Sequence, residues 1–259
     1  MDKTSLGDRM KEYENISRIY LTRRMPLIIR IDGKAFHTFT RGFKRPFDPI
    51  FIQSMQETAK YLCENIMGCK LAYVQSDEIS LLLTDYDELT TQPWFGKNLQ
   101  KIVSVSASMA TAAFNRAFIV NVRNTMLAAN EDDAELDRLN KVYLPKFHTA
   151  MFDARAFVLP KEEVCNYFIW RQQDAIRNSI QSVGQANFSH AKLNHKTQAN
   201  ILVMLESKGI NWEEDFAAIE KRGTCCLRKQ KAEEPRSHWE TDIFIPVFTE
   251  DRSYIESLL

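Results

Sequence analysis

A buried strand that ends in a carboxylate is the feature that most limits what this chain can fold into. Residues 26–29 form a short apolar run rich in Ile, which is typical of a strand inside a sheet. Asp32 stands just beyond that run, and Gly33 follows it, so the backbone can turn sharply there. Arg30 lies two residues before Asp32 and therefore points to the same side of the strand. The stretch predicts either an ordinary strand-ending turn capped by Asp32 or one half of a ligand site.

A predicted hairpin carries a second acidic element. Residues 71–74 and 79–83 are short apolar runs, and the polar residues 75–78 join them, a pattern typical of a β-hairpin. This turn contains Asp77 and Glu78, two adjacent carboxylates that repel each other unless something pairs with them. Glu78 is therefore either a supporting partner of a site or an ordinary surface acid.

Together, the two elements predict a metal site. If the strands are neighbours in one sheet, Asp32 and Asp77 converge at one edge of it. Two carboxylates and the Gly33 carbonyl are hard oxygen ligands, which suit Mg²⁺. Sites of this kind, as in the palm of nucleotide polymerases and cyclases, hold two ions about 3.5–4 Å apart and stabilise phosphoryl transfer. From the residues alone, metal-dependent nucleotidyl transfer is favoured, while a paired-acid hydrolase and a non-catalytic binding module stay open.

The order of elements predicts an α/β fold in which helices pack on a sheet. We expect one catalytic unit over residues 1–259, with a palm-like core over about 26–160 and a helical extension with a basic strand over about 161–259. The first helix is amphipathic and is expected to lie on the body of the protein. Besides the hairpin, the apolar pattern predicts helices at 6–18, 49–67, 102–114, 162–181, 189–208 and 212–219. It also predicts strands at 152–158 and 225–227.

Composition and missing motifs argue against several classes of protein. Lys plus Arg and Asp plus Glu number 34 each, so net charge does not indicate a nucleic-acid partner, although a local basic groove stays open. The five cysteines form no CxxC pair, which fits reduced thiols in a cytoplasm. Without a GxxxxGK, GxGxxG or GxSxG motif, a P-loop enzyme, a dinucleotide oxidoreductase and a Ser–His–Asp hydrolase are not supported. We expect no membrane partner, because residues 102–114 are too polar and too short to span a bilayer.

Two stretches place cations where an anion could bind. Residues 34–48 interleave cationic side chains with phenylalanines, which suits a ligand that carries phosphate or nucleotide. The alternative is that the rings pack beneath the loop and the cations are solvated. The predicted helix at 189–208 begins with His190, Lys192, His195 and Lys196, and cations at a helix N-terminus indicate an anion nearby.

These motifs resemble a known family. Residues 30–37, 45–48 and 72–78 together resemble the tRNA(His) guanylyltransferase family, whose members add nucleotides to the 5′ end of tRNA in the 3′-to-5′ direction. The similarity continues through the small-residue helix, residues 152–153, residues 171–172 and residues 221–224, so it covers most of the chain. The resemblance implies a nucleotidyltransferase with a palm-like fold.

The resemblance also implies roles for individual residues. Asp32 and Asp77 would be the catalytic carboxylates that bind two Mg²⁺ ions, with the Gly33 carbonyl as an added ligand. The residues implied in binding the incoming nucleotide and its triphosphate are Arg30, Lys34, Arg45, Ser76, Lys97 and Lys101. Contacts with tRNA or a second nucleotide would come from His190, Lys192, Lys196 and Arg222.

The residues after His190 separate two branches of the family. They read Ala191-Lys192, whereas the eukaryotic enzymes that add an untemplated G to tRNA(His) carry a His-Ile-Asn motif. The resemblance therefore implies the guanylyltransferase-like branch, which repairs 5′-truncated tRNA by template-dependent addition after activation of the 5′ end with ATP. Untemplated G addition and a non-catalytic tRNA-binding protein are the alternatives. Other implied properties are tRNA, ATP, GTP and other NTPs as partners, a homo-oligomer that is usually a tetramer, and a cytoplasmic location.

Overall fold

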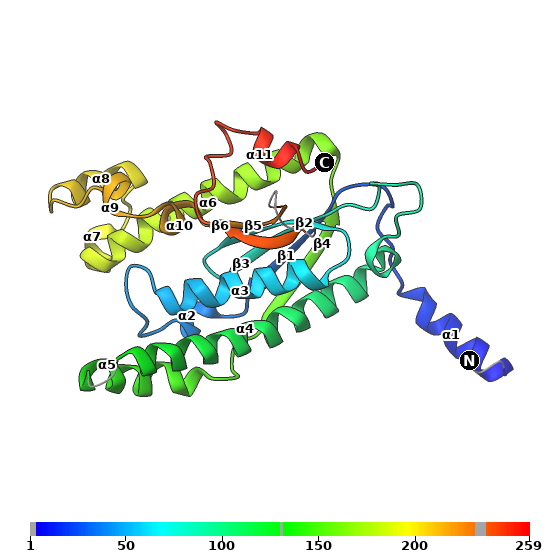
Figure 1. The fold of residues 1–259 in the computed structure, drawn as a ribbon, viewed down its shortest axis with the longest axis horizontal. Coiled ribbons are helices and arrows are strands. Elements are labelled where there is room, and N and C mark those ends of the chain that lie inside the picture. Colours follow the sequence, from blue (N-terminus) through cyan, green and yellow to red (C-terminus); the bar gives the residue numbers. More distant parts are fainter. Residues whose placement is uncertain (1–3, 130–131, 231–236) are drawn as a thin grey trace.

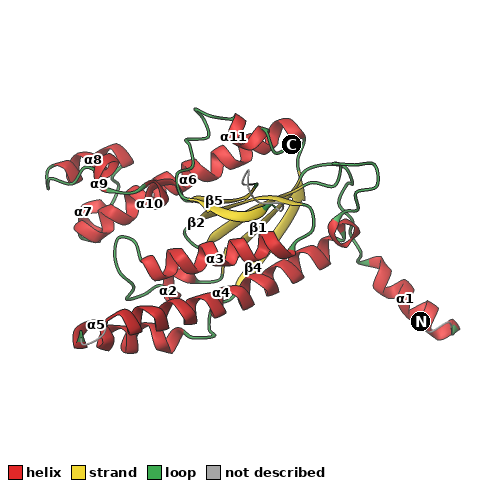
Figure 2. Ribbon diagram, viewed as in Figure 1, coloured by secondary structure: helices red, strands yellow, loops and turns green. Residues whose placement is uncertain are grey.

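The computed structural model describes residues 4–129, 132–230 and 237–259. Its centre is an antiparallel sheet of six strands in the order β4-β1-β3-β2-β5-β6 (Figure 1). Helices cover this sheet, which confirms the predicted α/β layered fold (Figure 2). The strands are β1 (Leu27–Gly33), β2 (Cys69–Gln75), β3 (Glu78–Leu83), β4 (Phe152–Val158), β5 (Thr224–Lys229) and β6 (His238–Asp242).

Three long helices and several short ones surround the sheet. Figure 1 shows the long helices α3 and α4 on one side of the sheet and α6 on the other, with α7 to α10 gathered at one end. The long helices are α3 (Pro49–Asn65), α4 (Leu99–Ala129) and α6 (Lys161–Asn187). The short elements are α1 (Ser5–Ile16), α2 (Phe36–Phe39), η1 (Trp94–Lys97), α5 (Asp133–Arg138), η2 (Leu139–Tyr143), η3 (Leu144–Lys146), α7 (His190–Leu193), α8 (Gln198–Glu206), α9 (Trp212–Asp215), α10 (Ala218–Arg222) and α11 (Ser253–Glu256).

Strand β1 has a helical layer on each of its two faces. Ile29 and Ile31 belong to the core that the sheet forms with α3 and α4, whereas Ile28 belongs to the core on the α6 side. Successive residues of a strand alternate between its faces. Arg30 and Asp32 therefore share the α6 face with Ile28, so the predicted site lies on that side of the sheet.

The loop that follows β1 is anchored by its aromatic side chains. Phe36, Phe39 and Phe43 are buried in the core with α3 and α4. The cations between and after them, such as Lys44 and Arg45, are exposed. Of the two alternatives for this loop, packing of the rings beneath it is confirmed for these three phenylalanines. The same packing holds the exposed cations on a fixed backbone.

Helix α1 does not lie on the body, and that prediction was wrong. None of its residues is buried, and Figure 1 shows it projecting from the rest of the chain. Its predicted apolar stripe is exposed, with Leu6, Tyr13 and Ile16 more than half accessible. The periodicity identified the helix correctly, but the sequence carried no information on what the stripe contacts.

Helix α4 is much longer than the stretch of 102–114 that the sequence predicts. It has 31 residues and is the one described helix that could cross a membrane by length and composition alone. The expectation that this stretch is too polar and too short for a span was therefore wrong. Ile102, Phe114 and Phe118 are nevertheless buried against α3 and the sheet, which is the packing of a core helix.

The C-terminal half of the chain contributes to the sheet as well as to the helical layer. Strand β5 pairs with β2, and β6 pairs with β5, so the sheet extends beyond residue 160. The division into a core at 26–160 and an extension at 161–259 stays a prediction. Strands β5 and β6 of the predicted extension belong to the same sheet as the strands of the predicted core. The single helix predicted at 189–208 is two helices, α7 and α8, because His195 adopts a left-handed backbone with φ of 56°.

Candidate active site

The strand pairing brings the two predicted catalytic carboxylates to one edge of the sheet. Asp32 is near the end of β1, and Asp77 lies in the turn between β2 and β3. Because β1 pairs with β3, Asp32 is directly opposite Glu78. The amide of Gly33 donates a hydrogen bond to the Asp77 carbonyl oxygen at 3.1 Å. The two acids are thus neighbours through backbone contacts, although 44 residues lie between them in the sequence.

The side chains at this edge form a donor set that fits a divalent cation. Burial raises the pKa of the Asp77 carboxyl, and the negative charge of Asp32 raises it further. The described residues contain no group of three or more His, Cys, Asp or Glu arranged to hold a metal. A cation at this edge would bind the carboxylates of Asp32 and Asp77 and the Gly33 carbonyl, which are the hard oxygen ligands that Mg²⁺ prefers.

Gly33 is required at this edge because of a close approach. A Cβ atom added to Gly33 would collide with the ring of Phe36. That ring is buried in the core beneath the loop, so it has little room to move. The glycine therefore lets the carboxylate-bearing strand end sit directly on the aromatic core.

Glu78 is a buried ion-pair partner rather than a surface acid. Its two carboxylate oxygens accept hydrogen bonds from Nε and Nη2 of Arg171 on α6, at 2.7 and 2.8 Å. Burial raises the pKa of Glu78, and the charge of Arg171 opposes that rise. The pair fastens α6 to the hairpin behind the carboxylate edge. Of the two alternatives that the sequence left open, the supporting role of Glu78 is the one that the geometry favours.

Arg30 has a buried donor available beside the two acids. Its Nε lies 4.0 Å from the nearest Glu78 carboxylate oxygen and has no hydrogen-bond partner among the described residues. A buried donor without a partner is costly, so an acceptor supplied by a ligand would stabilise it. Arg30 thus stays a candidate for binding a phosphate, as the sequence predicts.

Strand β4 adds two polar residues that sequence reasoning missed. Asp153 lies directly opposite Asp32, and Arg155 lies directly opposite Arg30. Directly opposite residues of an antiparallel pair share a face, so both project to the side of the candidate site. The alternation of Asp153 and Arg155 with apolar residues along the strand was a signal that could have identified them.

Lys34 and Ser76 also belong to this edge of the sheet. Lys34 directly follows β1 and is exposed. Ser76 lies beside Asp77 in the hairpin turn, where its backbone is left-handed with φ of 49°. A hydrogen bond from Ser76 lowers the pKa of the Asp77 carboxyl and so opposes the effect of burial. Both residues are therefore placed where the sequence predicts a nucleotide site.

Lys97 was predicted as a triphosphate contact, and the structure contradicts this. Its Nζ donates to the carbonyl oxygens of Thr22 and Met25 at 2.8 and 2.7 Å. It also forms an ion pair of 3.1 Å with Asp85, and both side chains are buried. Two of its N–H groups thus donate to backbone carbonyls and its charge is paired with Asp85, so Lys97 holds the chain before β1 against the loop before α4. The sequence could not reveal this role because the partners come from a distant segment.

Lys101 is exposed, and within this chain it lies far from the carboxylates of Asp32 and Asp77. It stands in the first turn of α4. That helix passes the edge of the sheet at Thr111, whose hydroxyl accepts a hydrogen bond from the Phe152 amide, and Phe152 pairs with Gly33. Ten residues separate Lys101 from Thr111, which corresponds to about 15 Å along a helix.

A second group of predicted residues lines a pocket of about 470 Å³ at the end of α6. Arg45, which was predicted to bind the triphosphate, lines it together with His190 and Lys196, which were predicted to contact tRNA or a second nucleotide, and with His195. The structure thus joins the loop after β1 with the segment around α7. Lys192 is exposed on α7 but does not line this pocket. The pocket carries several cationic or protonatable side chains and suits an anion such as a phosphate.

Arg222 is not part of that pocket, although it was predicted with the same group. Its Nε donates to the Ile245 carbonyl oxygen at 3.1 Å, and its own carbonyl accepts from the Tyr73 hydroxyl at 2.8 Å. Arg222 therefore links β2 to the C-terminal tail. Both contacts lie within the chain, and they give this arginine a structural role.

Comparison with known proteins identifies the family. The family model described as tRNAHis guanylyltransferase (Thg1) matches residues 7–160. The tRNA(His) guanylyltransferase of Schizosaccharomyces pombe is 29% identical over 66% of this chain and 56% of its own length. An uncharacterised protein of Acanthamoeba polyphaga mimivirus is 28% identical over 78% of this chain and 69% of its own length.

Solved structures agree with this match. A bacterial tRNA(His) guanylyltransferase-like protein in complex with ATP is 48% identical, covers 98% of both chains and superposes with a TM-score of 0.83. The tRNA(His) guanylyltransferase of Saccharomyces cerevisiae, at 20% identity and a TM-score of 0.65, shows the same fold. The fold is thus the palm-like one that the sequence predicts. Because the family model matches more than half of the chain, the protein belongs to the tRNA(His) guanylyltransferase (Thg1) family of nucleotidyltransferases.

Proposed function

We propose that this protein adds nucleotides to the 5′ end of tRNA in the 3′-to-5′ direction, as a template-dependent repair of truncated tRNAs. The observation that carries the proposal is the convergence of Asp32 and Asp77 at one edge of the sheet, where the Gly33 amide donates a hydrogen bond to the Asp77 carbonyl oxygen. Membership of the family supports the reaction class. Relatives that have been solved in complex with ATP and with GTP support nucleoside triphosphates as substrates.

The carboxylate edge would hold Mg²⁺, and we propose two ions. Asp32, Asp77 and the Gly33 carbonyl are the residues that would bind them, and the bound metal would neutralise charge on the reacting phosphates. Arg30 and Lys34 would contact the triphosphate from the same edge, with Ser76 donating from the turn. Arg155, opposite Arg30, would add a cation on the same face of the sheet.

The proposed reaction proceeds in two steps. A 5′-monophosphate end first attacks the α-phosphate of ATP, which joins AMP to the RNA and releases pyrophosphate. The 3′-hydroxyl of the incoming nucleotide then attacks the activated 5′ phosphate, forms a phosphodiester and releases AMP. An end that already carries a triphosphate needs no activation and releases pyrophosphate instead. The chain contributes by holding the phosphates and the attacking hydroxyl in line.

The pocket at the end of α6 is the proposed contact for the RNA. Its side chains Arg45, His190 and Lys196 lie on two segments that are far apart in the sequence, which suits a backbone phosphate held from both sides. Lys192 is exposed nearby on α7 and would add charge to the approach. A homotetramer is part of the proposal and is supported by the family resemblance. A cytoplasmic location is also proposed, and the five free cysteines support it.

The direct test is incubation with Mg²⁺, labelled NTPs and a tRNA that lacks its first nucleotide. The proposal predicts incorporation at the 5′ end, and more when the opposing base pairs with the offered nucleotide. A template C is compared with a template A while GTP is offered. Equal G addition opposite both bases would support untemplated addition instead. A lack of 5′ incorporation into any truncated or full-length tRNA would leave a non-catalytic tRNA-binding protein as the better account.

A further inference from the structure

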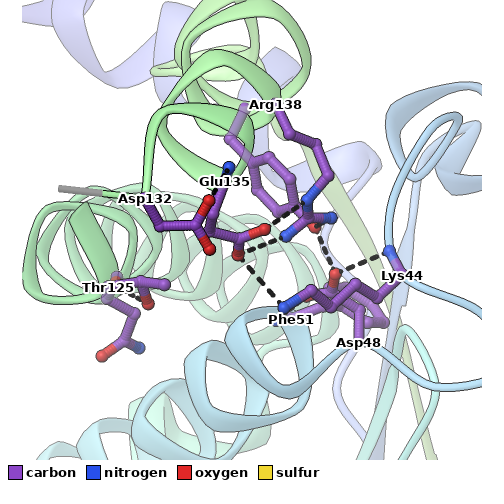
Figure 3. Close-up of polar contacts among 9 residues, drawn as sticks. Lys44, Asp48, Phe51, Thr125, Asp132, Glu135 and Arg138 are labelled. Atoms are coloured by element: carbon purple, nitrogen blue, oxygen red, sulfur yellow. Dashed lines mark hydrogen bonds and ion pairs between the residues drawn. The ribbon is translucent and has the colours of Figure 1, made fainter. Parts of the chain in front are cut away.

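A closed ring of polar contacts surrounds the base of the loop that carries Arg45. Asp48 caps α3 by accepting a hydrogen bond from the Phe51 amide at 2.9 Å (Figure 3). Its other carboxylate oxygen accepts from the Lys44 amide at 3.0 Å and from the Tyr143 hydroxyl. The carboxylate thus ties the start of the loop segment 44–48 to its end and to η2.

The second half of the ring runs through α5. Arg138 donates from Nη1 to the Tyr143 hydroxyl at 3.0 Å, and its Nε and Nη2 donate to both oxygens of Glu135 at 2.9 and 2.8 Å. Glu135 also forms an ion pair of 3.1 Å with the Lys44 ammonium, which returns the ring to its starting residue (Figure 3). The ring therefore joins the loop and α3 with α5 and η2.

Burial and charge show that the ring is well formed. Asp48 and Tyr143 are buried, and the Tyr143 ring stacks on Phe43 with centroids 4.6 Å apart. Hydrogen bonds from Arg138 and Lys44, together with their charges, lower the pKa of Glu135 to about 2, so this carboxylate stays ionised. Burial and the neighbouring Asp48 carboxylate raise the pKa of the Tyr143 hydroxyl, so it stays protonated and able to donate.

The ring encloses the backbone on both sides of Arg45. Only Arg45, Pro46 and Phe47 separate Lys44 from Asp48, and Phe47 is held in turn against Phe216 with ring centroids 5.7 Å apart. Arg45 itself is exposed and lines the cationic pocket. Its side chain is thus the part of this segment that remains available to a ligand.

We propose that this ring positions Arg45 at the pocket, and that Tyr143 and Arg138 are positioning residues for an RNA phosphate bound there. The inference rests on the proposed role of Arg45 in RNA binding. Neither Tyr143 nor Arg138 lines the pocket, so both act through the loop. Loss of one hydrogen bond in the ring lets the loop move, and displacement of a binding group by about 1 Å lowers its contribution strongly.

A double-mutant cycle between Tyr143 and Arg45 tests the inference. The variants are Y143F, R45A and the double variant. The readouts are Kd for a 5′-phosphorylated RNA, together with KM and kcat for nucleotide addition to that RNA. We expect Y143F to raise Kd and KM roughly tenfold with little change in kcat. In the R45A background, Y143F should cause no further increase, because its effect passes through Arg45.

Y86F is the matched control for Y143F. The Tyr86 hydroxyl is buried and has no hydrogen-bond partner among the described residues, so its removal should leave Kd unchanged. If Y143F unfolds the protein, E135Q opens the ring at its more accessible side and replaces it in the cycle. Independent, additive effects of Y143F and R45A would overturn the inference, as would an unchanged Kd in Y143F.

The Kd readout separates this inference from the proposed function. Binding of the RNA requires no chemistry, so the cycle can be completed even if no nucleotide is added. Coupling in Kd without any nucleotide addition would support the positioning role and contradict the proposed reaction. If nucleotide addition is normal and neither R45A nor Y143F changes Kd, the positioning role alone is contradicted.

Discussion

At the scale of single residues, the side chains near the carboxylate edge differ in whether their polar atoms already have partners. Arg30 keeps a buried Nε without a hydrogen-bond partner among the described residues. Glu78 and Lys97, which the sequence also brought into consideration, are paired within the chain. The type of a residue and its position in a motif do not show whether its polar atoms are already paired. The partners of Glu78 and Lys97 are distant in sequence, so the sequence could not distinguish these two residues from Arg30.

Arg171→Met should destabilise the protein strongly. It leaves the Glu78 carboxylate buried without its bidentate partner, so the free energy of unfolding should fall by about 3–5 kcal/mol. K141M is the control, because the Lys141–Asp137 ion pair is exposed, and its loss should cost less than about 0.5 kcal/mol. Urea denaturation measures both. A loss below about 1 kcal/mol in R171M would show that the pair contributes little.

Arg30→Met and Lys97→Met should have opposite effects. R30M removes the proposed phosphate donor, so the KM for the nucleoside triphosphate should rise about tenfold while stability changes little. K97M leaves Asp85 buried without its cation, so the free energy of unfolding should fall by about 3–5 kcal/mol while KM is unchanged. Steady-state kinetics and thermal melting separate the two. A raised KM in K97M at temperatures where it is folded would restore the sequence-based role of Lys97.

At the scale of elements, local patterns predicted most helices and strands of the sheet, but not their ends or breaks. Strand β1, the β2–β3 hairpin and α3 follow directly from apolar runs and periodicity. The break between α7 and α8 was missed, although Thr197 and Asn200 form a capping box that marks a new helix start. The prediction of the carboxylate site assumed that the strands are neighbours in one sheet. The sequence could not show this, and the pairing of β1 with β3 meets the assumption.

The contact between α5 and the Arg45 loop should make stability depend on pH. Glu135 has a folded-state pKa of about 2, below the value of about 4.3 for an unfolded chain. Its stabilisation is therefore complete above about pH 5 and is lost as the pH falls through about 4.3 towards 2. Because Glu135 is partly exposed, we expect a contribution of about 1 kcal/mol or less. Denaturation between about pH 3 and pH 6 should show a smaller decline for E135Q, and equal declines in both proteins would contradict this.

At the scale of the whole molecule, the sheet order and the placement of α1 were beyond the reach of the sequence. Strand β5 joins the sheet by pairing with β2, across about 150 residues of intervening chain, and β6 joins it by pairing with β5. Such long-range pairing leaves no local signal. Helix α1 has a clear apolar stripe, yet none of its residues is buried. Amphipathic periodicity thus predicts a helix but does not say which surface covers it.

Deletion of residues 1–16 should leave the body of the protein intact. Helix α1 buries none of its residues, so the melting temperature should change by no more than about 2 °C. Differential scanning calorimetry of the truncated and full-length chains measures this. A larger decrease would show that α1 packs against a surface in solution.

Asp32 and Asp77 are proposed to act together at one site for nucleotide addition, and this is the claim on which the rest depends. The most direct measurement is 5′ incorporation of labelled GTP into a tRNA lacking its first nucleotide, by D32N, D77N and the double variant. Asp8→Asn, which changes an exposed acid on α1, is the control. We predict that each single variant loses at least about 10³-fold in rate while remaining folded, and that the double variant is no slower than either. Activity near that of the unmodified chain in D32N or D77N would contradict the account.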